Sequence, residues 1–153
     1  MDGHRTIARL REHQAAILAN FEATRQLLRA EMPEDPRGLA RLRGELVRLL
    51  SGYQYFKHHE IFDRLIADGP SENARIGRRL KAECISLGEE VRLHVARWNA
   101  VGAEESWTDY RPVVAAFIEQ IIAHMDYELR AAIAVLTPDE GGPAVSRPAV
   151  HSG

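Results

Sequence analysis

Two pairs of residues combine an imidazole with a carboxylate four positions later. His59 precedes Asp63, and His124 precedes Glu128. Residues four apart lie on the same face of an α-helix, so each pair can offer a nitrogen and an oxygen ligand to a single metal ion. Oxygen and imidazole donors suit iron or manganese better than they suit a structural zinc site. The sequence therefore predicts a non-haem metal site, provided that helices bring the two pairs together.

Three further residues extend the predicted ligand set. His13 lies on the apolar face of the first predicted helix, and Glu83 or Cys84 lies on that of the third. His58 is the alternative to His59, but a phenylalanine follows His58 four positions later and cannot bind a metal ion. The predicted metal ligands are His13, His59, Asp63, Glu83, His124 and Glu128.

Helical periodicity predicts the elements that would carry these residues. Apolar residues recur every three or four positions almost throughout the chain, which is the period of an α-helix and not of a β-strand. Helices are expected at residues 6–30, from 36 to about 66, from 71 to about 102, and from 106 or 108 to 136. Asp35 is a suitable N-cap and Pro36 a suitable first residue for the second helix.

Short connections between four long helices favour an all-α, up-down-up-down antiparallel four-helix bundle. The apolar face of the second helix, which would point inward, is predicted to include Tyr53, Phe56, His59 and Asp63. Residues equally far from a short turn lie at the same depth, which places His59 in one layer with residues 13, 83 or 84, and 124. His94 falls about ten residues, or ~15 Å, from this layer and is predicted to be structural.

Composition limits the class of protein and its partners. The bundle is expected to occupy residues 1–136, followed by a disordered tail rich in Pro, Gly and Ser at residues 137–153. The net charge is −2 and charges of both signs are interspersed, so no nucleic-acid partner is expected. A single cysteine excludes an internal disulfide framework. With no signal peptide or long apolar segment in the sequence, we expect a cytoplasmic protein without a membrane partner.

Three segments resemble the hemerythrin-like, or HHE cation-binding, family. HHEIFD at residues 58–63 is similar to the family's signature, in which a second-helix histidine is followed four residues later by a carboxylate. His13 in EHQAAI resembles the first-helix ligand, and His124 with Glu128 resembles the fourth-helix element. The resemblance covers residues 5 to about 136.

This resemblance implies an oxygen-bridged di-iron centre in the bundle, with O₂, NO, peroxide or iron itself as the molecule bound or sensed. The sequence departs from the family pattern at Asp63, where glutamate is commoner, at Phe62 and Leu129, which interrupt paired acids, and at residues 81–84 (KAEC), where a histidine is expected. Two alternatives follow. One is a metal-free bundle that acts as a protein-interaction or regulatory module, and the other is an iron-dependent enzyme that consumes peroxide or NO. A protein partner or a homodimer is compatible with each.

Overall fold

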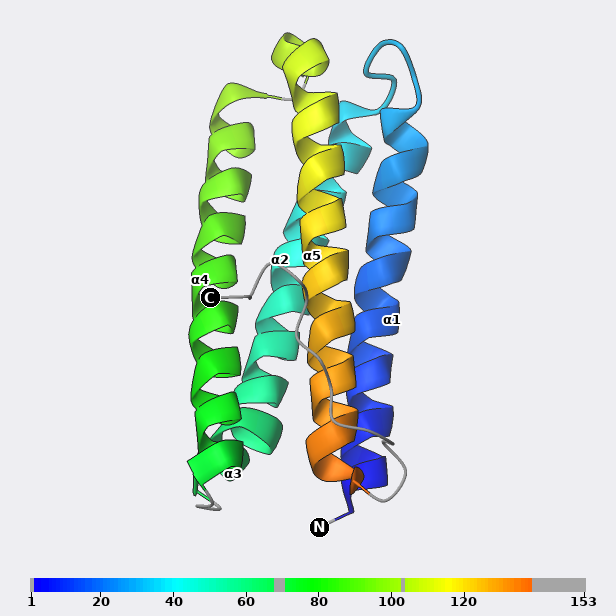
Figure 1. Cartoon of the computed structure of the whole chain (residues 1–153). Coiled ribbons are helices and arrows are strands. Elements are labelled where there is room, and N and C mark those ends of the chain that lie inside the picture. Colours follow the sequence, from blue (N-terminus) through cyan, green and yellow to red (C-terminus); the bar gives the residue numbers. More distant parts are fainter. Residues whose placement is uncertain (1, 68–70, 103, 139–153) are drawn as a thin grey trace.

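Four long helical rods make up the protein (Figure 1). The structure, a computed structural model, describes residues 2–67, 71–102 and 104–138. Its α-helices are α1 (Gly3–Leu28), α2 (Pro36–Lys57), α3 (Asp63–Ala67), α4 (Ser71–Val101) and α5 (Trp107–Leu136). A π-helical turn, η1 (His58–Phe62), joins α2 to α3, and a 3₁₀ turn, η2 (Glu104–Ser106), precedes α5. The described residues contain no β-strand.

The rods run alternately up and down (Figure 1). α1 packs against both α2 and α5, while η1 and α3 extend the α2 rod and pack against α4. The arrangement confirms the predicted all-α, antiparallel four-helix bundle. It also brings the start of α1 beside the end of α5 at one end of the molecule.

Local signals in the sequence set the ends of the rods. The Asp35 carboxylate accepts a hydrogen bond of 2.9 Å from the N–H of Gly38, which caps α2 as predicted. Asp2 accepts one of 3.0 Å from the N–H of His4, so α1 begins earlier than predicted. Gly102 ends α4 with φ at 88°, a left-handed conformation that glycine adopts without strain.

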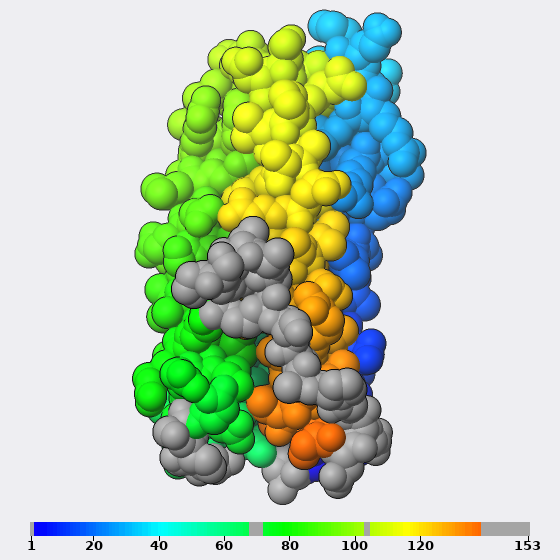
Figure 2. All heavy atoms as spheres, in the orientation of Figure 1, coloured from blue at the N-terminus to red at the C-terminus, as the bar shows by residue number. Residues whose placement is uncertain are grey.

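The inner faces of all four rods fill the core. The least exposed apolar side chains include Leu10, Ile17 and Phe21 from α1, Leu39 and Tyr53 from α2, Leu80 and Trp98 from α4, and Tyr110 and Ile121 from α5. In the space-filling view, α5 runs between α4 and α1 along the bundle (Figure 2). Burial at steps of three and four residues is the packing expected of amphipathic helices.

The π-turn changes which residues of the second rod face inward. The N–H of Asp63 donates to the carbonyl of His58, five residues earlier, so this turn holds one residue more than an α-helical turn. The buried residues are Tyr53, Phe56 and Lys57 before the turn and Ile61, Phe62 and Leu65 after it. His59 is exposed and Asp63 only partly buried. The prediction that these two residues lie on the inner face is therefore wrong.

The structure describes only the first two residues of the predicted tail. The predicted tail at residues 137–153 lies outside the described residues except for Thr137 and Pro138, and the N–H of Thr137 still donates to the carbonyl of Ile133 at 3.0 Å.

Across the described ranges, no helix is both long and apolar enough to cross a bilayer.

Candidate functional site

A lysine and a glutamate form an ion pair in the centre of the bundle. Nζ of Lys57, in the last turn of α2, lies 2.6 Å from Oε2 of Glu128 on α5. Their side chains are only 3% and 2% exposed. An unpaired charge at this depth would cost several kcal/mol of desolvation energy, so each residue depends on the other.

Hydrogen bonds connect this ion pair to two further side chains. The hydroxyl of Tyr53 donates to Oε1 of Glu128 at 2.7 Å. Nε2 of Gln14, on α1, donates to the Tyr53 hydroxyl at 2.8 Å and to the carbonyl of Met125 at 2.9 Å. The Lys57 ammonium also lies 3.9 Å from the centre of the Tyr53 ring, a favourable cation–π contact. The network therefore links α1, α2 and α5.

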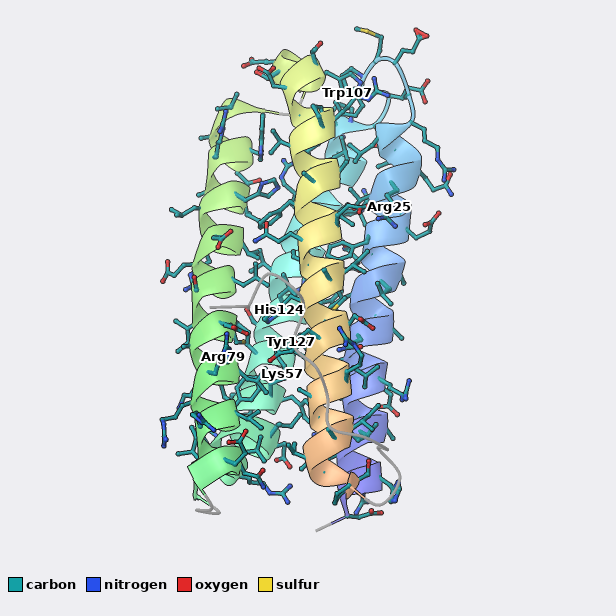
Figure 3. The ribbon with its side chains drawn as sticks, in the orientation of Figure 1. Arg25, Lys57, Arg79, Trp107, His124 and Tyr127 are labelled. Carbon is teal, nitrogen blue, oxygen red and sulfur yellow. The ribbon has the colours of Figure 1, made fainter. Side chains whose placement is uncertain are left out.

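His124 lies beside the same carboxylate. Its Nε2 atom is 3.0 Å from Oε2 of Glu128, one helical turn further along α5. The contact is close but poorly aligned, because this buried nitrogen has no hydrogen-bond partner of good geometry among the described residues. Figure 3 shows His124 and Lys57 at neighbouring depths of the bundle. Of the two i, i+4 pairs found in the sequence, this is the one that converges.

Burial and charge set the protonation of the group. Burial alone would raise the pKa of Glu128, but the Lys57 charge and the contact with His124 outweigh burial and hold that pKa below its usual range. Burial, together with the negative charge of Glu128, raises the pKa of Tyr53, and burial raises the pKa of the nearby Cys84 thiol. At neutral pH the carboxylate is ionised, whereas the phenol and the thiol keep their protons.

The two other predicted histidine ligands lie outside this network. His13 is partly buried and stacks on Phe56, with 4.9 Å between ring centres. His59 is exposed and packs against Tyr55, with 4.2 Å between ring centres. His94, predicted to be structural, stacks on Phe117 at 4.4 Å, in agreement with that prediction.

The two predicted acidic ligands from the second and third rods form ion pairs nearer the surface. Oδ1 of Asp63 accepts from Nζ of Lys81 at 2.9 Å. Oε2 of Glu83 accepts from Nε of Arg79 at 3.2 Å, one turn earlier on α4. Each carboxylate therefore already has a cationic partner.

The geometry does not fit a di-iron centre. Of the six predicted ligands, only His124 and Glu128 meet. Within residues 2–67, 71–102 and 104–138, no three His, Cys, Asp or Glu side chains converge as metal ligands would. The group nearest to Glu128 is the Lys57 ammonium, whose positive charge would repel a metal ion bound to the same oxygen.

No protein-family model, curated protein or solved structure matches this chain. The structure supports an all-helical, four-helix protein, and no comparison supports the resemblance to the hemerythrin-like family. Any statement about function must come from the residues themselves.

Sequence reasoning missed two members of the network, Lys57 and Gln14. Lys57 follows Tyr53 by four residues, which places it within about 40° of Tyr53 around the helix. Gln14 has the same relation to Leu10. Both polar residues therefore stand on an apolar face, and a lysine in that position needs a buried acid as its partner. The lysine on an apolar face is visible in the sequence, and Glu128 was the only acid on the last helix that was predicted to face inward.

A small cavity adjoins the ion pair, with a volume of about 40 Å³. Tyr53, Lys57, Cys84 and His124 line one part of it. The remaining wall is largely aliphatic and includes Val47, Leu50, Leu87, Val91, Ile121 and Met125. Since one water needs roughly 10–15 Å³ by this measure, the cavity suits a molecule of up to about three or four non-hydrogen atoms.

Proposed function

We propose that this protein is a metal-free regulatory bundle, in which Lys57 takes the place of a metal ion and the adjoining cavity binds a small neutral molecule. The observation that carries the proposal is the 2.6 Å contact between the Lys57 ammonium and Glu128. This contact neutralises the buried carboxylate that the sequence assigned to the metal.

The chemistry of the cavity supports binding rather than turnover. Two of its potential nucleophiles, Tyr53 and Cys84, have raised pKa values and keep their protons at neutral pH, and a third, Lys57, is paired with Glu128. A protonated thiol or phenol is a poor nucleophile. The ligand class that the hemerythrin-like resemblance implied, a diatomic molecule or peroxide, is small enough for the cavity.

Metal analysis tests the first half of the proposal. Protein expressed in iron-supplemented medium should carry far less than one iron or manganese per chain by inductively coupled plasma spectrometry. The rival function is an iron site built on His124 and Glu128, with Lys57 withdrawn. Stoichiometric iron, lost in His124→Ala but kept in His94→Ala, would establish that rival and overturn the proposal.

Xenon tests the second half, because it enters small apolar cavities that water fills poorly. Under xenon pressure, the methyl signals of Leu87, Val91 and Ile121 should shift in ¹³C-resolved NMR spectra. Val91→Phe, which fills the cavity, should abolish the shifts. Unchanged methyl signals in the wild-type protein would rule out a small-molecule site here.

A further inference from the structure

A second hollow adjoins the cavity on its solvent side and shares part of its lining, including the exposed Ser51 and Arg92. This outer groove, of about 380 Å³, runs between the α2–η1 rod and α4. Tyr55, His58, His59 and Arg92 line it, together with the exposed Ile85. The groove thus contains the histidine pair that the sequence singled out and that the buried network does not use.

Three residues line both the outer groove and the inner cavity, namely Ser51, Gln54 and Arg92. Of these three residues, only Gln54 is partly buried. Its side chain reaches α4, where its Nε2 atom donates to the carbonyl of Cys84 at 3.1 Å. The end of this side chain is held by neutral hydrogen bonds to the carbonyl and the thiol of Cys84, and each such bond contributes little net stability. Side-chain rotation at a partly exposed position is also fast.

Gly88 explains how Gln54 fits between the rods. A Cβ atom at residue 88 would come within 2.3 Å of Nε2 of Gln54, so the amide lies in space that a side chain of α4 would otherwise take. When the Gln54 side chain swings outward, residue 88 therefore offers no side chain to close the gap.

We infer that Gln54 is the gate of the small-molecule site, through which a ligand of up to about three or four non-hydrogen atoms passes from the outer groove to the buried end of the cavity at Lys57 and His124. The inference rests on the proposed small-molecule function and adds its route and its size selection. Gln54 admits compact molecules when it rotates, and it excludes larger ones because the opening lies between two packed helices.

The rate at which the Cys84 thiol is modified measures opening of this gate. Cys84 is the only cysteine in the chain, and it lines the inner cavity with only 2% of its surface exposed. Methyl methanethiosulfonate should modify it much faster than a bulky aromatic disulfide does. Gln54→Ala should raise the rate of modification roughly tenfold or more, as opening of a local barrier does. Gly88→Ala, which displaces the Gln54 side chain, should also raise it. The matched control is Gln120→Ala, which removes an exposed glutamine on α5 and should leave the rate unchanged.

Denaturant distinguishes gating from unfolding of the whole bundle. Modification through a local gate should be insensitive to low concentrations of urea, whereas modification through global unfolding rises steeply with urea. Equal rates in wild type and Gln54→Ala, or rates that follow only the global stability of each variant, would overturn the gate. In that case xenon binding in the inner cavity would still decide the proposed function independently.

Discussion

Lys57 is the residue on which the interpretation of the site depends. Buried lysines are rare and need a compensating charge, which Glu128 supplies at 2.6 Å. The Lys57 ammonium also lies 3.9 Å from the ring centre of Tyr53 and 5.8 Å from that of Phe62, and these contacts restrict its position. We expect this ion pair to favour a unique arrangement of the core more than it adds net stability.

Lys57→Met should destabilise the fold strongly, because it leaves Glu128 buried without its cation. We expect a loss of about 3–5 kcal/mol in the free energy of unfolding, measured by denaturant titration. Adding Glu128→Gln, which removes the orphaned charge but keeps an acceptor for Tyr53, should restore most of this loss.

The control for that experiment is a lysine in an ion pair near the surface. Lys81→Met breaks the contact with Asp63, whose side chain is 45% exposed, and should cost less than about 1 kcal/mol. Equal effects of Lys57→Met and Lys81→Met would show that burial of the Lys57 charge has no energetic consequence.

At the level of elements, the sequence predicted the four rods well and the orientation of one rod poorly. Caps at Asp35 and Gly102 and the apolar period located the helices, because these are local features. The π-turn depends instead on contacts with other elements, because Ile61, Phe62 and Leu65 are stabilised by packing on α4 and the core. An α-helical period carried across residues 58–62 pointed His59 and Asp63 inward, although both lie off the buried face. Lys57 precedes the turn and was missed for a different reason, because a lysine is not expected on an apolar face.

The π-turn gives an unusual expectation for a deletion. Without Glu60, the buried residues of the second rod would follow the spacing of a regular α-helix, because the extra residue in the turn is removed. The deletion variant should fold with unchanged helix content in circular dichroism and lose less than about 2 kcal/mol.

A deletion in regular helix provides the comparison. Removing the exposed Gly52 from α2 rotates everything on one side of it by about 100° and should unfold the protein or cost far more. If removal of Glu60 and removal of Gly52 were equally damaging, the turn would not be a one-residue insertion in an otherwise regular helix.

Two helical glycines should respond to alanine in opposite directions. A Cβ at Gly77 would lie 2.9 Å from Cβ of Leu65 and 3.0 Å from the carbonyl oxygen of Phe62, so Gly77→Ala forces α4 away from α3 and η1. A Cβ at Gly52 would meet nothing within 4 Å. We expect Gly77→Ala to lower the melting temperature and Gly52→Ala to raise stability by about 0.5–1 kcal/mol. A stabilising Gly77→Ala would contradict the close packing of these helices.

For the whole molecule, buried titratable groups predict how stability depends on pH. Burial, with smaller contributions from Arg43 and Arg97, lowers the pKa of His94 from 6.5 to about 4. Between these values the unfolded chain binds more protons than the folded one, so stability falls as pH falls from 6.5 to about 4. Glu128 adds a second loss of stability as the pH falls from 4.5 to its depressed pKa of about 2.

His94→Phe should flatten the upper part of this profile while keeping the stack on Phe117. Part of the His94 imidazole is accessible to solvent, so we expect its titration to account for about 1–2 kcal/mol of the stability that the wild-type protein loses. The substitution should remove this part of the loss. His13 and His58, whose pKa values burial also lowers, should account for the slope that remains. Urea denaturation at several pH values measures both curves, and parallel curves for the two proteins would show that His94 titrates normally.

The positions of the tryptophans also determine which part of the bundle intrinsic fluorescence reports on. Both tryptophans, Trp98 and Trp107, contact Tyr110 at the end where α4 passes into α5, and Figure 3 shows Trp107 far along the rods from Lys57. Intrinsic fluorescence therefore senses one end of the molecule, while the thiol of Cys84 senses its middle. If the protein melts as a single cooperative unit, emission and thiol exposure will share one midpoint. If the tryptophan end unravels first, emission will change while the thiol is still protected, and the bundle will have to be treated as two units of unequal stability.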